Sequence, residues 1–165
     1  MDDRPEPSLV DGEREQLNGF LDFLRATVVM KSSGLSEQDA HRSVLASPLM
    51  TVAGLLAHLR WVEASWFDKV LGGREGPAPY DPELPDAEFE VAKDMTLDRL
   101  LAEYTEECAR SRETVAGMAL TDVVDLRGDQ RVNVRWVLLH MIEETGRHAG
   151  HLDVIREFLD GSTGE

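Results

Sequence analysis

The sequence contains a single cysteine, Cys108, among its 165 residues, so the chain cannot form an internal disulfide bond. This composition is compatible with a reducing compartment. Because free cysteine is usually buried and inert, we interpret Cys108 as a small core residue rather than as a nucleophile. The N-terminal stretch MDDRPEPSLVDGERE is acidic and has neither the basic region of a signal peptide nor a long apolar run. We therefore expect a cytoplasmic protein without a membrane anchor.

Basic side chains are also scarce. The chain has 17 lysines and arginines against 32 aspartates and glutamates, which gives a formal net charge of −15. Such a charge repels a phosphate backbone, so nucleic acid is not expected as a partner. The 165 residues, 42% of them hydrophobic, are enough for one domain with a proper core and too few for two. We expect a single domain that spans residues 1–165.

Four long segments have the apolar spacing of amphipathic helices. We expect them to cover residues 11–31, 51–72, 96–118 and 133–161. The core side of the first segment is expected to carry Leu17, Phe20, Leu21, Leu24 and Val28. Between the first two segments, Ser36 is expected to cap one short helix. These patterns predict an all-α fold, a four-helix bundle whose centre is a common place for metal sites.

Two connections interrupt the helical patterns. Residues 74–94 contain four prolines and many acidic residues, which predicts a long loop. Residues 123–136, VVDLRGDQRVNVRW, alternate around the turn signal Gly128-Asp129. This pattern predicts either a small hairpin or an extended crossing.

The last predicted helix carries ionisable side chains on its apolar side, in the stretch HMIEETGRHAGHLD. At about 100° per residue, Glu144 shares a stripe with apolar residues and with three histidines. The members of this stripe are Val137, His140, Met141, His148, His151, Ile155, Phe158 and Leu159. A buried carboxylate needs a cation, a proton or a polar partner, because it is otherwise costly. We therefore predict that Glu144, His148 and His151 face inward for a functional reason.

His58 is predicted to face inward from the second helix, because Leu55 and Val62 lie one turn to either side. Glu144 and His148 are four residues apart, so their side chains can converge on one ion. With His58 they would make three ligands and leave a coordination position open, as in catalytic metal sites. The alternative is that each histidine is an ordinary hydrogen-bonded core residue. The carboxylate among them favours the metal.

The stretches LLAHLRWVEASWF and WVLLHMIEETGRHAGHLDVIRE resemble the DinB superfamily of four-helix-bundle metalloenzymes (DinB/YfiT-like), in particular its actinobacterial branch. The resemblance implies a divalent metal held by His58, Glu144 and His148. The commonest set in that superfamily is three histidines, and Glu144 departs from it in the way the related mycothiol-dependent maleylpyruvate isomerase does. Zinc is the first expectation, with nickel, manganese or iron as alternatives, because imidazole and carboxylate do not discriminate between them.

The resemblance further implies a mycothiol S-transferase or isomerase that acts on a small electrophile, and a homodimer. The open coordination position would receive the thiol sulfur, and His151 is the one candidate for a general base or a substitute ligand. Two alternatives stay open. The first is a hydrolase that activates water at the same ion. The second is a metal-binding stress-response bundle without catalysis.

Other polar and aromatic residues are given structural roles. His140 is expected to have a structural role, and His41 is expected to be exposed and has no assigned function. Glu63 falls on a different side of its helix from His58. Trp61 and Trp66 are interpreted as core or interface residues rather than as substrate platforms.

Overall fold

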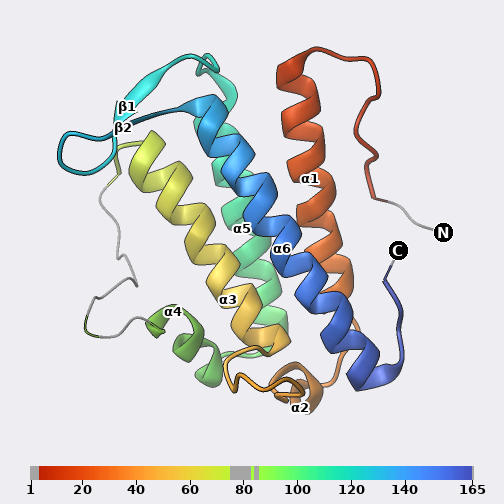
Figure 1. The fold of residues 1–165 in the computed structure, drawn as a ribbon. Coiled ribbons are helices and arrows are strands. Elements are labelled where there is room, and N and C mark those ends of the chain that lie inside the picture. The colour runs from red at the N-terminus through yellow and green to blue at the C-terminus, as the bar shows by residue number, and fades with distance from the viewer. Residues whose placement is uncertain (1–3, 75–82, 84–85, 165) are drawn as a thin grey trace.

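The computed structural model describes residues 4–74, 83 and 86–164. Four long helical elements form a bundle, joined by short helices and one hairpin (Figure 1). The elements are α1 (Glu13–Ser32), α2 (Glu37–Ala40), α3 (Val52–Glu63) with a π-helical continuation (Ala64–Leu71), α4 (Ala87–Glu90) with a 3₁₀ turn (Val91–Asp94), α5 (Leu97–Ala116), β1 (Val123–Asp125), β2 (Arg131–Asn133) and α6 (Val134–Asp160). The prediction of an all-α bundle is confirmed.

Polar side chains mark the starts of the long helices. Thr51, Thr96 and Asn133 each accept a hydrogen bond from a backbone N–H in the first turn of the helix that follows. Gly161 ends α6 in the left-handed conformation, with φ of 77°. The sequence places these boundaries within a few residues because the capping chemistry is local.

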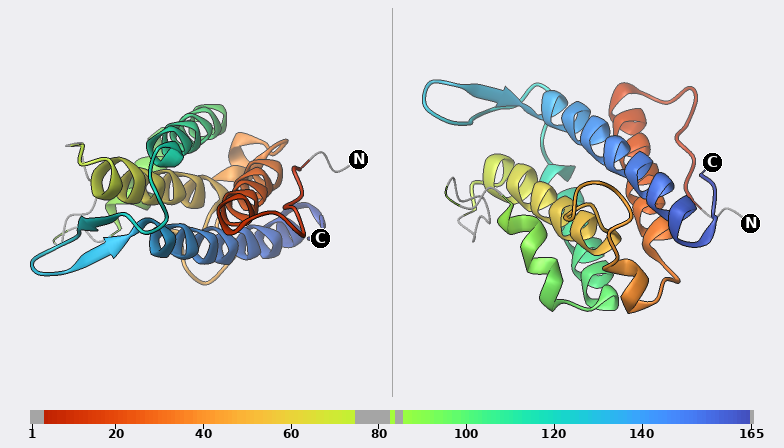
Figure 2. Two further views of the ribbon diagram at one scale, coloured as in Figure 1. Left: turned by 90° about the horizontal axis from the view of Figure 1, so that it is seen from above. Right: turned by 60° about the horizontal axis from the view of Figure 1, so that its bottom comes forward.

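The segment between α5 and α6 is an antiparallel hairpin in which Val123 pairs with Asn133 and Asp125 with Arg131. Gly128 takes a positive φ of 56° in the connection, which glycine adopts without strain. The sequence pattern was compatible with either a hairpin or an extended crossing, and the structure has the hairpin. Figure 2 shows it projecting beyond the ends of the helices.

The predicted loop of residues 74–94 is partly helical. Residues 75–82 and 84–85 lie outside the described residues, but 87–94 form α4 and the 3₁₀ turn, and both pack against α3. The prediction of a loop was therefore wrong for this part. A four-residue helix has too few positions to show a periodicity, and its packing against α3 stabilises it instead.

The bundle packs α1 along α6 and α3 along α5, and no helix in the described ranges is both long and apolar enough to cross a membrane. Two aromatic residues predicted for the core are exposed, Phe20 by 50% and Phe158 by 64%. The buried arc of α6 is centred on Leu138, Thr145 and Leu152, because α6 packs mainly against α1. Glu144 thus lies at the edge of this arc, on the side of α3.

Candidate metal centre

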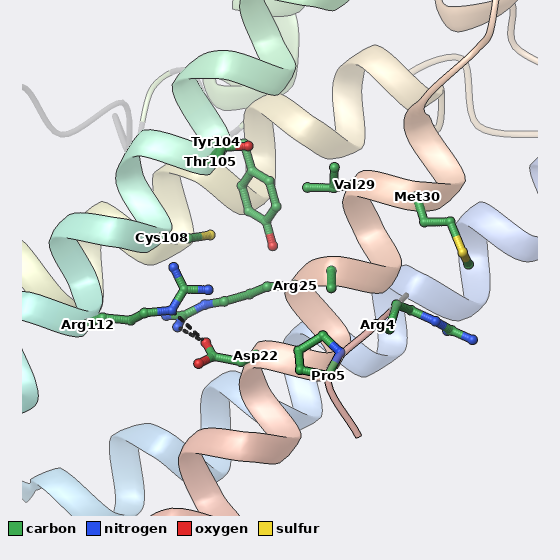
Figure 3. Close-up of a pocket in the computed structure, with 11 residues that line it drawn as sticks. Arg4, Pro5, Asp22, Arg25, Val29, Met30, Tyr104, Thr105, Cys108 and Arg112 are labelled. Carbon is green, nitrogen blue, oxygen red and sulfur yellow. Dashed lines mark hydrogen bonds and ion pairs between the residues drawn. The ribbon is translucent and has the colours of Figure 1, made fainter. Parts of the chain in front are cut away.

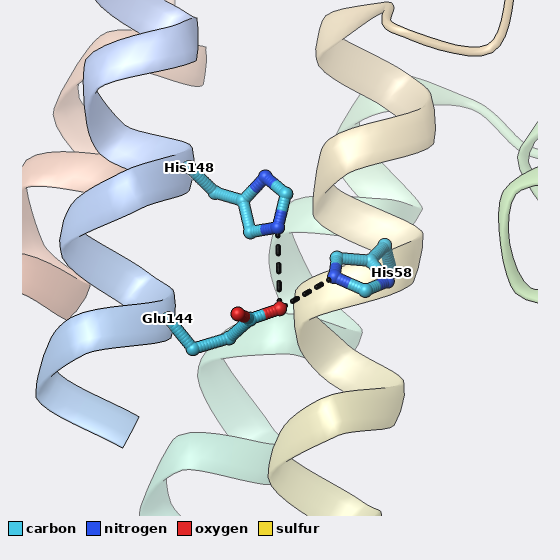
Figure 4. A group of neighbouring side chains, drawn as sticks. All are labelled: His58, Glu144 and His148. Atoms are coloured by element: carbon cyan, nitrogen blue, oxygen red, sulfur yellow. Dashed lines mark hydrogen bonds and ion pairs between the residues drawn. The ribbon is translucent and has the colours of Figure 1, made fainter. Parts of the chain in front are cut away.

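Three side chains from two helices meet between α3 and α6 (Figure 4). His58 comes from α3, and Glu144 and His148 come from successive turns of α6. Glu144 Oε1 lies 3.1 Å from His58 Nε2 and 3.2 Å from His148 Nε2. One ligand atom of each residue lies within 4.8 Å of the others. The structure therefore brings together the three residues that the sequence singled out.

The spacing of these atoms fits a small divalent ion. Ligand atoms bound tetrahedrally at about 2.0–2.2 Å from an ion lie roughly 3.3–3.6 Å apart. The observed 3.1 and 3.2 Å are within a few tenths of an ångström of that range. Two neutral imidazoles and one carboxylate carry a net charge of −1, which suits a divalent cation. Three protein ligands leave at least one position open.

His58 is held from behind by α4. Its Nδ1 donates to Glu88 Oε1 over 2.7 Å, and its ring stacks on Phe89 with centroids 4.6 Å apart and planes 8° apart. Nε2 is therefore directed at Glu144. A carboxylate behind a metal-binding histidine fixes the ring and increases its basicity. Sequence reasoning missed Glu88, because no local pattern distinguishes it from the other acidic residues of the predicted loop.

His148 is supported in a similar way by His151. The Nδ1 atoms of the two rings are 3.3 Å apart, while His148 Nε2 faces Glu144. With an ion on His148 Nε2, the ring would carry its proton on Nδ1 and donate it to His151 Nδ1, which would have to be unprotonated. Burial, together with the neighbouring His148 and Arg147, lowers the pKa of His151 and favours this neutral form. His151 contacts a candidate ligand, and Glu144 lies nearer the centre of the site.

The charges of the site are strongly coupled. Burial alone would lower the pKa of His58, but hydrogen bonds to Glu144 and Glu88 outweigh it and raise the pKa to about 9. Hydrogen bonds from His148 and His58 hold the pKa of Glu144 well below its usual range. The site thus attracts positive charge to the atoms between α3 and α6. A bound cation would replace the proton on His58 Nε2.

The family model for mycothiol S-transferases matches residues 16–161 of the chain. The protein belongs to this family. No curated protein matches it. Among solved structures, the mycothiol-dependent maleylpyruvate isomerase aligns with a TM-score of 0.64 and 18% identity over 84% of this chain and 60% of that chain. A single-site mutant of that isomerase aligns with the same TM-score and coverage at 17% identity. This chain therefore spans about 60% of the isomerase's length, and the likeness shows the fold.

Two further histidines of this mycothiol S-transferase family member lie outside the candidate centre. The ring of His140 packs against Trp66 and stacks on Trp136, with centroids 4.9 and 5.1 Å away, in agreement with a structural role. His41 was expected to be exposed with no assigned function, and this prediction was wrong. Its Nδ1 contacts the Glu37 carbonyl, and its Nε2 lies 3.1 Å from the carbonyl oxygens of Ala92 and Met95, so it joins α2 to the segment before α5.

Glu63 lies on the opposite side of α3 from His58 and has a partner that the sequence did not reveal. Its carboxylate accepts from Arg25 Nε and Nη2 over 2.7 and 2.6 Å, and the two side chains are 1% and 5% exposed. Arg25 also donates to Asp22. This buried pair connects α1 to α3 and is part of the core.

A cavity of about 570 Å³ lies beside this pair, between α1 and α5 (Figure 3). Tyr104 and Cys108 form part of its wall, together with the more exposed Thr105. Burial raises the pKa of the Cys108 thiol to about 12, so the thiol stays protonated. The interpretation of Cys108 as an inert core residue agrees with this. The cavity is lined by none of the three candidate metal ligands.

Proposed function

We propose that the protein is a divalent-metal-dependent mycothiol S-transferase in which His58, Glu144 and His148 hold the ion. One observation carries this proposal. The Nε2 atoms of two histidines approach a single carboxylate oxygen, while the Nδ1 of each histidine is engaged by another side chain, Glu88 or His151. Such an arrangement orients both imidazoles toward a common point, as metal-binding histidines require. Zinc is the first candidate, with nickel, manganese or iron as alternatives.

A bound divalent ion would lower the pKa of a coordinating thiol and so favour the thiolate, the form that attacks electrophiles. The ligands from α3 and α6 would leave at least one position free for the thiol sulfur. The sulfur would form a new bond to the electrophilic carbon as the leaving group departs with its bonding electron pair, as chloride does from monochlorobimane, and the thiol proton would pass to solvent or to a base. Glu88 and His151 keep the imidazoles in place throughout.

His151 was predicted as the candidate general base, and this stays a prediction. Its Nδ1 faces His148 Nδ1 at 3.3 Å, so a proton taken up at that atom would place two N–H groups against each other. We therefore assign His151 the positioning of His148 as its first role. A base at this place would have to act through Nε2.

Activity and metal content test the proposal together. Purified protein should contain about one divalent ion per chain and, when loaded, should conjugate mycothiol to an electrophile such as monochlorobimane. His58→Ala should lose both properties. His140→Phe is the control, because it removes an imidazole but keeps a ring against Trp66 and Trp136.

Two results would contradict the proposal. Full metal content and full transferase activity in His58→Ala would show that His58 does not bind the ion and that the site described above is wrong. Turnover of esters or amides by the loaded protein, without thiol conjugation, would favour the hydrolase instead.

A further inference from the structure

A second cavity, of about 740 Å³, lies along α3 beside the candidate metal centre. It lies among the π-helical end of α3, α4 and the β1–β2 hairpin, which surround that side of α3 in Figure 1. Its lining residues come from these three parts of the chain: Trp61, Val62, Ser65, Trp66, Lys69, Val70, Glu88, Asp125, Leu126, Arg127 and Gln130. No single local sequence pattern joins them, so only the tertiary structure brings them together.

The cavity adjoins the metal centre, although none of the three candidate ligands lines it. Glu88 lines it and also accepts the hydrogen bond from His58 Nδ1, on the side of the ring that faces away from Glu144. Trp61 follows His58 by one turn, and Lys69 lies two turns beyond Trp61 along the same element. At about 1.5 Å per residue, the cavity extends roughly 15 Å from His58. This length suits a ligand of two rings whose reactive group lies at one end.

The π-helical end of α3 shapes the wall of this cavity. Its i→i−5 hydrogen bonding continues to Gly72, whose N–H donates to the Phe67 carbonyl over 2.8 Å. Residues four and five positions apart share a side in such a helix, so Ser65, Lys69 and Val70 line one surface. π-helical segments are rare and occur frequently at functional sites.

The lining favours a neutral ligand with many hydroxyl groups. Lys69 and Arg127 are balanced by Glu88 and Asp125, so the wall selects neither an anion nor a cation. Gln130 and the charged groups supply hydrogen-bond donors and acceptors at several points around the ligand.

Two indoles, Trp61 and Trp66, supply apolar surface to the same cavity. Indoles combine an apolar face with a polar N–H, which suits the C–H faces and hydroxyl edges of sugar rings. The Trp61 Nε1–H is buried and has no hydrogen-bond partner among the described residues. These tryptophans, interpreted from sequence as core or interface residues, therefore also have the chemistry of a binding surface.

We infer that this cavity binds the glucosamine–inositol head of mycothiol and thereby directs the cysteinyl thiol toward the metal centre. The inference rests on the proposed function, because it assigns the head of the same cosubstrate. The head has two neutral polyhydroxylated rings, and the thiol lies at one end of the molecule. The cavity has matching polarity and length, and it adjoins the centre at Glu88, the residue that supports His58.

Two substitutions test this inference on metal-loaded protein. Ser65 is exposed at the cavity, so Ser65→Phe fills part of the space without disturbing the core. Gln130→Ala removes an exposed amide and adds no bulk. The matched control is Thr105→Phe, which adds the same ring to the cavity between α1 and α5. Each variant is assayed with mycothiol and with N-acetylcysteine, which has no sugar head.

We expect Ser65→Phe to raise the KM for mycothiol by about tenfold or more, and Gln130→Ala to raise it less. The kcat/KM with N-acetylcysteine should stay unchanged in both variants, and Thr105→Phe should behave as wild type. An unchanged KM for mycothiol in both variants would overturn the inference while leaving the transferase function intact. An equal loss with both thiols would also overturn it, because the effect would then not depend on the head.

A wild-type protein that fails to use mycothiol would refute the proposed function, and a second measurement would then decide the inference alone. Calorimetric titration with N-acetylglucosaminyl-inositol, the neutral head without its thiol, should give binding to wild type and to Thr105→Phe and a loss of binding in Ser65→Phe. Absence of binding to the wild-type protein would overturn the sugar site.

Discussion

The choice of Glu144 over His151 as the third ligand is the sharpest prediction about the candidate centre. Either residue could join His148 by helical spacing, since one is four residues before it and the other three residues after it. In the structure, Glu144 Oε1 lies near the Nε2 of both histidines, whereas His151 contacts only the far nitrogen of His148. The two residues should therefore differ strongly when each is replaced by alanine.

The geometry sets the expected magnitudes. His151→Ala removes a group behind a ligand, and such losses reduce metal affinity by about 10–100-fold. Glu144→Ala removes one of three ligands and the only negative charge among them, so its loss should exceed about 100-fold, or roughly 2.7 kcal/mol. Glu144→His should recover binding, because the resemblance to the DinB superfamily implies that three histidines are a working set.

Competition between each variant and a fluorescent zinc chelator measures these affinities. Absorption of the cobalt-substituted protein reports separately whether the coordination geometry is kept. Circular dichroism checks that each variant is folded. A larger loss of affinity in His151→Ala than in Glu144→Ala would refute the assignment of the third ligand.

Three other outcomes are expected. Glu88→Ala should lower metal affinity by about 10–100-fold, because it removes the group that fixes the ring of His58. Glu88→Gln should recover part of this loss. The competition with the zinc chelator measures both affinities. Chelation should lower the melting temperature but leave the helical circular dichroism spectrum at room temperature, because the bundle core holds the fold. Glu63→Gln should cost up to about 3 kcal/mol in unfolding free energy, measured by urea denaturation, because it leaves the buried Arg25 with only the partly exposed Asp22 as a counter-charge.

Each of these expectations has a result that contradicts it. Wild-type affinity in Glu88→Ala would show that the contact with His58 Nδ1 does not support the site. Loss of helical signal on chelation would make the metal structural. For the buried pair, the double variant Arg25→Met with Glu63→Leu should be more stable than Glu63→Gln alone. A double variant of lower stability would contradict the argument from unpaired charge.

The sequence by itself determined the four long helices, their approximate starts and the identity of the candidate ligands. Helical spacing and capping depend on residues a few positions apart, so Thr96 and Asn133 could be placed as helix starts without a tertiary structure. The same reasoning brought Glu144 and His148 onto successive turns. Their convergence with His58 needed only the expectation that inward faces of a bundle meet.

The tertiary structure decided what surrounds those ligands. Glu88 lies on a helix of four residues that packing against α3 stabilises, and the Arg25–Glu63 pair joins residues 38 positions apart. The cavity along α3 likewise combines side chains of α3, α4 and the hairpin. Such groupings depend on which elements pack together and at what rotation. Periodicity along one helix cannot specify that rotation, and this is why Phe20 and Phe158 were expected in the core and are exposed.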